Sequence, residues 1–158
     1  CAQICSACKE LPSFDLFSLA RNSIGDKGLA AVANDLASTK VWQLVLTETK
    51  FGVEGVKALA KSGEDPTKFA DLKWLFLDSS DVGDKGVEAL ANAMIKGFRS
   101  VERLALQNTK LTNRGMSALA MAIGQGALPK CEYLYVQNND FDIEGKQMLR
   151  AAAKTRGD

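Results

Sequence analysis

Apolar residues follow two different periods in this chain, one directly after the other. The stretch Leu72–Met94 shows both. In its first half the period is close to two, which is typical of a β-strand, with Leu72, Leu75 and Leu77 and, between them, Trp74 and Phe76. In its second half, after Gly83, the apolar residues have helical spacing, at Val87, Leu90, Ala91 and Met94. This stretch therefore predicts a strand followed by an amphipathic helix.

The same strand-then-helix pattern recurs along the chain, and a glycine marks each copy. These glycines are spaced 27, 31, 29 and 30 residues apart, at Gly28, Gly55, Gly86, Gly115 and Gly145. A self-similar period near thirty residues is typical of solenoid proteins. We therefore predict a single domain over residues 1–158, with five repeats that start near residues 14, 41, 72, 101 and 131.

Other positions of the repeat carry residues with a clear structural role. Small polar residues that can hydrogen-bond the backbone at a turn lie six residues before each glycine, at Asn22, Thr49, Ser80, Thr109 and Asn139. The glycine itself is expected to open the helix, where the strand and helix backbones come too close for a Cβ atom. Asp26, Asp84 and Asn113 are expected to accept hydrogen bonds from free N–H groups at the helix starts.

Two repeats carry a recognisable motif, VERLALQNTKLTNRG (Val101–Gly115) and CEYLYVQNNDFDIEG (Cys131–Gly145). The pattern LxxLxLxx(N/T)xLxxxG followed by a helix resembles the leucine-rich repeat. The period near thirty is similar to that of the ribonuclease-inhibitor subclass, and five units in phase cover residues 14–153. The resemblance implies an α/β fold: a curved right-handed solenoid with parallel strands on the concave face and helices on the convex face.

The two ends of the array differ from its middle. Residues 1–13 resemble the tail of one repeat's helix, so we expect them to form the end of a preceding helix or an N-terminal cap. In the last repeat, Lys146 and Arg150 replace apolar residues of the helix. Terminal repeats need a polar outer face, which predicts that the last repeat is a cap.

The outward positions of the strands carry the candidate functional residues. Side chains alternate along a strand, so those between the buried leucines face the concave surface: Trp74 and Phe76, Arg103 and Ala105, Tyr133 and Tyr135. Trp42 comes just before the second strand, nearer the rim. At about 4.8 Å between strands, Trp74 and Tyr133 should be roughly 10 Å apart, with the guanidinium of Arg103 against their ring faces. Ala105 should leave a dip between Phe76 and Tyr135.

Aromatic side chains beside an arginine form the composition of an interface hot spot. Such rings could instead be scattered surface residues or could stiffen the sheet. Further along the strands, Asp78, Gln107 and Gln137 form a polar band suited to hydrogen bonding at the rim of an interface or to simple solvation. We predict a non-catalytic module that binds a protein or peptide through its concave face.

Composition argues against several other classes of function. The formal charge is +1, from 20 basic and 19 acidic residues, which gives no electrostatic footprint for nucleic acid. The chain has no histidine, the commonest general base and metal ligand. It also has no phosphate-binding loop or nucleophile motif, and no apolar run of the roughly 18 residues that a membrane span needs. We therefore expect no enzyme activity, no cofactor and no membrane insertion.

Cys1, Cys5 and Cys8 lie together, and Cys131 lies far from them. This usage favours buried or half-buried thiols in a reducing compartment, either the cytoplasm or an organelle. Two alternatives to the binding module stay open. The chain could be a structural or accessory subunit, or a fragment of a longer repeat array, beside neighbouring subunits of a larger complex. The Cys5–Cys8 pair could instead form a redox or zinc element.

Overall fold

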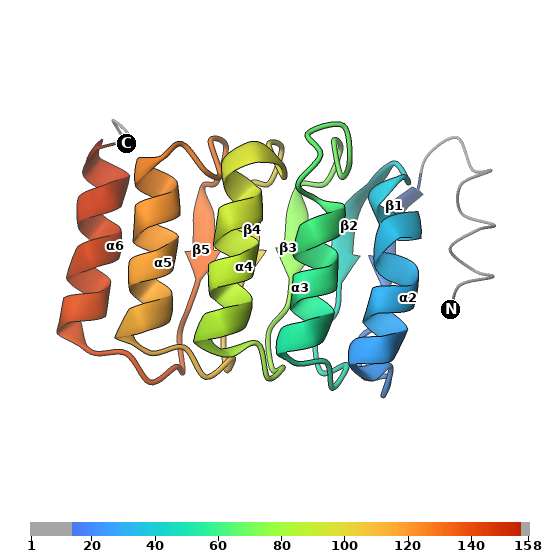
Figure 1. Cartoon of the computed structure of the whole chain (residues 1–158), viewed down its shortest axis with the longest axis horizontal. Coiled ribbons are helices and arrows are strands. Elements are labelled where there is room, and N and C mark those ends of the chain that lie inside the picture. Colours follow the sequence, from blue (N-terminus) through green and yellow to red (C-terminus); the bar gives the residue numbers. More distant parts are fainter. Residues whose placement is uncertain (1–13, 156–158) are drawn as a thin grey trace.

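The computed structural model describes residues 14–155, which form a parallel sheet with a layer of helices along one side (Figure 1). The strands are β1 (Phe14–Ser18), β2 (Val41–Val45), β3 (Trp74–Phe76), β4 (Arg103–Ala105) and β5 (Tyr133–Tyr135). The helices are α2 (Gly25–Ala37), α3 (Val53–Ser62), α4 (Gly83–Lys96), α5 (Asn113–Gly124) and α6 (Ile143–Thr155). The strands lie in the sheet in chain order, so each repeat packs beside the one before it.

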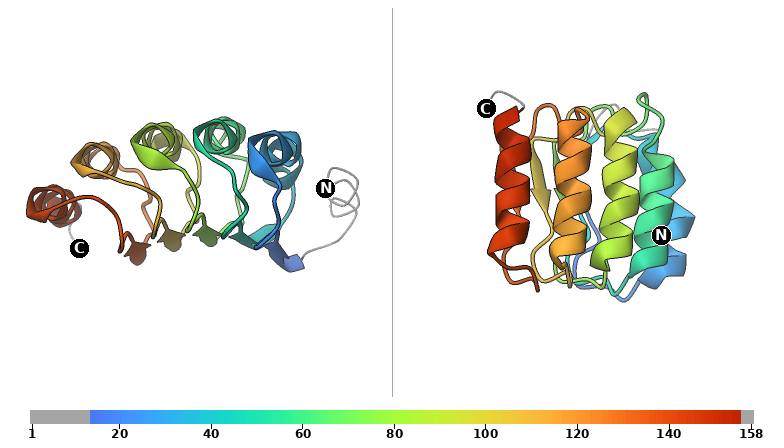
Figure 2. Two further views of the ribbon diagram at one scale, coloured as in Figure 1. Left: turned by 90° about the horizontal axis from the view of Figure 1, so that it is seen from below. Right: turned by 60° about the vertical axis from the view of Figure 1, so that its left-hand side comes forward.

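The two layers curve together, with the strands on the inner arc and the helices on the outer arc (Figure 2). Helices are wider than strands, so a row of strand–helix units bends toward its strand side. The predicted α/β solenoid of about five repeats, with a concave sheet and a convex helical layer, is confirmed. The concave face of the sheet carries no helix of residues 14–155, which leaves it open for contact (Figure 2).

The core lies between the sheet and the helices, and the predicted apolar positions fill it. In the middle repeats the strand leucines and the helix stripe are fully buried, among them Leu44, Leu75, Leu104, Leu59 and Leu90. In the last repeat, Leu134, Val136 and Leu149 are only partly buried. Among the described residues these side chains have neighbouring repeats on one side alone, which explains the difference.

A second row of core residues lies in the turns that precede the strands and was not predicted. Phe69, Phe98 and Leu128 are fully buried, although their backbones have positive φ angles of 48°, 54° and 53°. This left-handed conformation is unfavourable for such residues, and burial of large side chains offsets its cost. The rings of Phe69 and Phe98 stack with centroids 5.2 Å apart, so the row links successive repeats.

The small polar residues at the strand exits hydrogen-bond the backbone as predicted, with one exception. The Thr49 hydroxyl donates to the carbonyl of Leu46 at 2.8 Å, and the Thr109 hydroxyl donates to that of Leu106 at 2.6 Å. The buried Ser80 hydroxyl has no hydrogen-bond partner among residues 14–155. The turn itself is made one residue earlier, where each repeat has a positive φ, at Arg21, Glu48, Ser79, Asn108 and Asn138.

Asp26 and Asp84 cap helices, but each caps the helix of the following repeat. The Asp26 carboxylate accepts hydrogen bonds from the N–H groups of Gly52 and Gly55, at 2.7 and 2.8 Å, where α3 begins. Asp84 does the same at the start of α5, from Thr112 at 2.9 Å and Gly115 at 3.0 Å. The predicted acceptor role is therefore correct, and each of these contacts joins two adjacent repeats.

Asn113 makes the corresponding contact with the last helix through its amide group. Its oxygen accepts from the N–H of Asp142 at 3.1 Å, and its nitrogen donates to the Asp142 carboxylate at 2.9 Å. That hydrogen bond, with a second one from the backbone of Glu144, lowers the pKa of Asp142. The negative charge of Asp142 stays beside the N-terminus of α6, where the helix dipole favours it.

The marker glycine lies inside the first helical turn and does not open the helix. At Gly115 a Cβ atom would stand 2.6 Å from the capping oxygen of Asp84 and 3.0 Å from the side chain of Leu111. The predicted reason, close approach of the strand and helix backbones, is wrong. Glycine is needed here because the capping carboxylate of an earlier repeat occupies the space that a side chain would take.

We expect Asp84→Ala to reduce the free energy of unfolding by about 1–2 kcal/mol, because it leaves capping donors at the start of α5 unsatisfied. The side chain accepts from the Thr112 hydroxyl as well, at 2.7 Å. Urea denaturation followed by circular dichroism would measure the change. Asp84→Asn keeps one acceptor oxygen and should lose less. Equal stability of wild type and Asp84→Ala would contradict the capping role.

The last repeat is a polar cap only in part. Lys146 and Arg150 are exposed as predicted. Beside them, however, an apolar cavity of about 290 Å³ opens between β5 and α6, lined by Ile123, Leu128, Cys131, Glu132, Leu134, Leu149, Arg150 and Ala153. The prediction of a capping repeat is therefore right for the helix surface and wrong for the end of the core.

Candidate functional site

The strand register brings the predicted concave residues into two rows across the sheet. Gln43, Trp74, Arg103 and Tyr133 pair in sequence from β2 to β5. Val45, Phe76, Ala105 and Tyr135 form the second row, one step further along the strands. Because side chains alternate, Leu75 and Leu104 face the core while Trp74, Arg103 and Tyr133 face the open side of the sheet.

Arg103 lies between Trp74 and Tyr133, as the sequence predicts. Its Cζ atom is 4.4 Å from the ring centroid of Trp74 and 4.9 Å from that of Tyr133. A guanidinium at this distance from two ring faces is attracted by both, and the contact holds its long side chain in place. Tyr133 remains 46% exposed, so this stack is part of the surface.

The other rings brace this stack. Trp42, which lies within β2 and not just before it, meets Trp74 edge to face, with centroids 4.9 Å apart. Phe76 lies 6.3 Å from Trp74, and Tyr135 stacks on Tyr133 at 6.2 Å. We call these six side chains the aromatic row: Trp42, Trp74, Phe76, Arg103, Tyr133 and Tyr135.

Ala105 occupies the position where the sequence predicts a dip in the concave surface. Ala105 is only 4% exposed, although it faces the concave side between Phe76 and Tyr135. Its partners on the two neighbouring strands, Phe76 and Tyr135, carry much larger side chains. The dip between these two rings stays a prediction.

The polar band lies further along the strands, beyond the aromatic row. The Asp78 carboxylate accepts a hydrogen bond from the Thr47 hydroxyl at 3.0 Å. Gln107 is partly exposed and Gln137 is exposed, and neither side-chain amide forms a hydrogen bond within residues 14–155. These three residues are thus accessible from the concave side, as the prediction requires.

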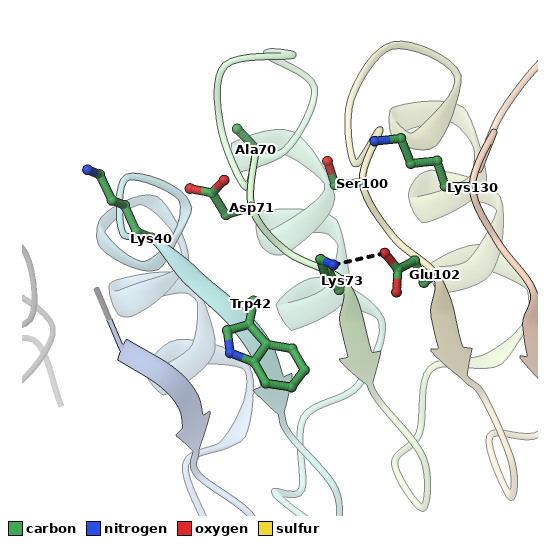
Figure 3. Close-up of a pocket in the computed structure, with 8 residues that line it drawn as sticks. All are labelled: Lys40, Trp42, Ala70, Asp71, Lys73, Ser100, Glu102 and Lys130. Carbon is green, nitrogen blue, oxygen red and sulfur yellow. Dashed lines mark ion pairs between the residues drawn. The ribbon is translucent and has the colours of Figure 1, made fainter. Parts of the chain in front are cut away.

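A groove lies at the other edge of the aromatic row, where the strands begin (Figure 3). It has a volume of about 680 Å³ and is lined by Lys40, Trp42, Ala70, Asp71, Lys73, Ser100, Glu102 and Lys130. Lys73 and Glu102 form an ion pair across it, with Nζ and Oε1 3.2 Å apart. Trp42 belongs to both the groove and the aromatic row, so the two form one continuous surface.

The sequence did not predict the charged side of this groove. Its lining comes from corresponding positions of successive repeats, just before and at the start of each strand. The sequence does contain a sign of the groove, because one position of the repeat, directly before the strand segment, carries polar or charged residues in four successive repeats: Lys40, Asp71, Ser100 and Lys130. Charged residues at loop positions are usually solvated, and only the folded arrangement shows that they surround a common space.

Within residues 14–155, no group of three His, Cys, Asp or Glu side chains could hold a metal ion. Cys131 is partly buried, as expected, with its Sγ 3.5 Å from the carbonyl oxygen of Tyr133. Cys1, Cys5 and Cys8, and the predicted N-terminal helix tail over residues 1–13, lie outside the described residues. None of the helices described here is both long and apolar enough to cross a membrane.

Comparison with known proteins agrees with the repeat architecture. The family model "Leucine Rich repeat" matches residues 17–33, 72–91 and 99–120. A ribonuclease inhibitor from Sus scrofa is 28% identical over 152 residues, which cover 94% of this chain and 32% of that protein. A NACHT, LRR and PYD domains-containing protein 5 from Mus musculus is 28% identical over 157 residues, or 82% of this chain and 13% of the relative. The chain thus spans a third or less of the length of these relatives.

Proposed function

Since this chain is a leucine-rich repeat protein with repeats like those of ribonuclease inhibitor, we propose that it is a non-catalytic module that binds a protein or peptide through its concave face. Leucine-rich repeat proteins commonly mediate protein–protein interactions, and one relative is by name an inhibitor of another protein. The aromatic row supplies the anchors, and Asp78, Gln107 and Gln137 supply hydrogen bonds at its rim.

The observation that carries this proposal is the stack of Trp74, Arg103 and Tyr133 on the open sheet face, across β3, β4 and β5. Tryptophan, tyrosine and arginine are the residues that contribute most often to interface hot spots. Here they hold one another in place, so little side-chain freedom would be lost when a partner binds. A rigid, half-exposed aromatic surface is therefore available for contact.

The rings could instead serve only to stiffen the sheet, and mutation can separate the two roles. We expect the double variant Trp74→Ala with Tyr133→Ala to bind peptide ligands at least about tenfold more weakly, because it removes two anchors. The ligands would be selected on the wild-type protein from a displayed library of random 12-residue peptides. Isothermal titration calorimetry would give the dissociation constants, and circular dichroism would show whether the variant is folded.

Met121→Ala provides a matched control. Met121 is a large apolar residue, 63% exposed, on α5 at the convex side of the solenoid. It should leave peptide binding unchanged. If the double variant is folded and binds every selected peptide as tightly as wild type, the concave face is not the binding site.

A structural role in a larger assembly is a second candidate, and the apolar cavity beside α6 favours it. Cys131, Leu134 and Leu149 line that cavity and are only partly buried, so a neighbouring protein could cover them. This role uses the end of the solenoid and leaves the concave face available. The two functions are therefore compatible in one molecule.

A further inference from the structure

We infer that the partner segment bound by the concave face is acidic and sets a carboxylate against Arg103, with an apolar or aromatic side chain next to it. This inference rests on the proposed function and adds the chemical class of the partner. It also assigns Arg103 the role of selecting that class, whereas the rings supply contact area.

Arg103 is a cation without a negative counterpart in the described part of the chain. Its guanidinium lies against the ring faces of Trp74 and Tyr133, and it forms no ion pair within residues 14–155. The carboxylate next to it in sequence, Glu102, is paired with Lys73 at 3.2 Å. Ring faces cover the flat sides of a guanidinium, but its five N–H donors point outward in the plane and need oxygen acceptors.

A partner that covers the rings must also cover Arg103. Its strand, β4, lies between those of Trp74 and Tyr133, so no contact with both rings can avoid it. Removing an unpaired charge from water costs free energy, and a neutral apolar partner would offer the guanidinium no interaction that offsets this desolvation cost. A carboxylate removes the penalty, because it can accept two parallel hydrogen bonds from one guanidinium.

The groove beside the aromatic row favours the same class of partner. Its lining holds three lysines, Lys40, Lys73 and Lys130, against two carboxylates, Asp71 and Glu102 (Figure 3). Lys40 and Lys130 form no ion pair with residues 14–155. With Arg103, four cations and two anions thus surround this end of the site, and an acidic segment would meet net positive charge.

The remaining acids near the site suggest how the segment is oriented. Asp78 lies at the opposite end of the concave face, two positions after Phe76, where it is hydrogen-bonded to Thr47. Glu132 precedes Tyr133 but lines the cavity beside α6 and not the groove. The acidic end of the partner should therefore point toward the groove, and its apolar side chain should lie over Phe76 and Tyr135.

A double-mutant cycle on peptides from the same library tests this inference. Binding would be measured for each peptide and for a copy in which its acidic residue is replaced by Gln or Asn, against wild type and Arg103→Gln. We expect loss of the acid to weaken binding to wild type about tenfold or more, as for a charge-assisted hydrogen bond, and to have little effect on Arg103→Gln. Arg103→Lys should restore only part of the affinity, because lysine lacks the planar fork.

The possible outcomes separate this inference from the proposed function. If peptides lose affinity on the Trp74→Ala, Tyr133→Ala variant but bind Arg103→Gln as tightly as wild type, the acidic-partner inference fails and the concave-face function stands. Selected peptides that lack acidic residues would also overturn it. If the double variant binds all peptides normally, both proposals fail. Both tryptophans of the chain lie in the aromatic row, so wild-type fluorescence reports directly on occupancy of this surface.

Discussion

Replacement of Gly97 by alanine is expected to destabilise the protein severely, by about 3 kcal/mol or more, or to prevent it from folding. Gly97 directly follows α4, and a Cβ atom there would lie 1.6 Å from the carbonyl oxygen of Gly63 and 2.8 Å from its carbonyl carbon. Gly63 in turn follows α3. The ends of two neighbouring helices therefore touch backbone to backbone at this pair of glycines.

The size of the effect follows from what the added methyl group would meet. A crowded side chain can change its rotamer, but the Gly63 carbonyl belongs to the backbone that closes α3, and its N–H donates to Leu59 and Ala60. The two repeats would have to move apart, which would uncover the stacked rings of Phe69 and Phe98 beside them. A displaced interface between repeats loses buried apolar contact along its whole length.

Urea denaturation of Gly97→Ala would measure this effect, with Gly124→Ala as a matched control. Gly124 ends α5, and an added Cβ atom would have no neighbour within 4 Å. The control should be as stable as wild type or more stable by up to about 1 kcal/mol, because alanine restricts the unfolded chain. Equal stability of the two variants would show that the Gly63–Gly97 contact is not required.

Asn139→Ala is expected to reduce the free energy of unfolding by about 2–3 kcal/mol, since it leaves several backbone groups without partners at once. The side-chain oxygen of Asn139 accepts from the N–H groups of Thr109 and Leu111, at 2.8 and 3.0 Å. Its nitrogen donates to the carbonyls of Leu106 and Val136, at 2.7 and 2.8 Å. One amide thus joins the ends of β4 and β5 across the repeat boundary.

The corresponding residue of the first repeat provides the comparison. Asn22 is exposed and its nitrogen donates only within its own repeat, to the carbonyls of Leu19 and Ala20. Asn22→Ala should therefore cost less than about 1 kcal/mol. Thermal unfolding followed by circular dichroism would rank the two variants. If both lose the same small amount, the hydrogen bonds between repeats contribute little to stability.

Asn139→Ala should also affect the candidate site. Tyr133 and Tyr135 lie on β5, and hydrogen bonds between β4 and β5 keep Tyr133 against Arg103. Peptide binding should weaken in the folded variant, although Asn139 is not one of the proposed contact residues. In this variant, replacing the acidic residue of the peptide should still weaken binding, because Arg103 is intact. That result would show that Asn139 supports the aromatic row and does not contact the peptide.

Most of the candidate site could be predicted from the sequence, because the repeats are in phase. Trp74, Arg103 and Tyr133 occupy one position of the repeat, and parallel strands of a solenoid pair at equal positions. The period of two then assigns each side chain to the core or to the concave face. Neighbouring strands lie about 4.8 Å apart in any sheet, so the arginine had to lie between the rings.

The errors concern features that depend on side-chain conformation or on loops. Phe69 and Phe98 resemble isolated apolar residues in polar connections, and only the left-handed turns carry them into the core. The groove of Lys40 and Lys130 is lined by residues from four successive repeats, at and just before the start of each strand. The period of the apolar residues does not predict how the loops of successive repeats are placed relative to one another.

The spacing of apolar residues along the chain is enough to predict the solenoid, its five repeats and the line of residues across its concave face. These follow from a local pattern that repeats, since each unit has the same environment as the one before it. Only the tertiary structure shows that Asp84 caps α5, that Gly97 touches Gly63, and that no acid of residues 14–155 forms an ion pair with Arg103. These contacts join residues about thirty positions apart. They depend on how far and at what angle one repeat is placed from the next, which the hydrophobic pattern does not specify.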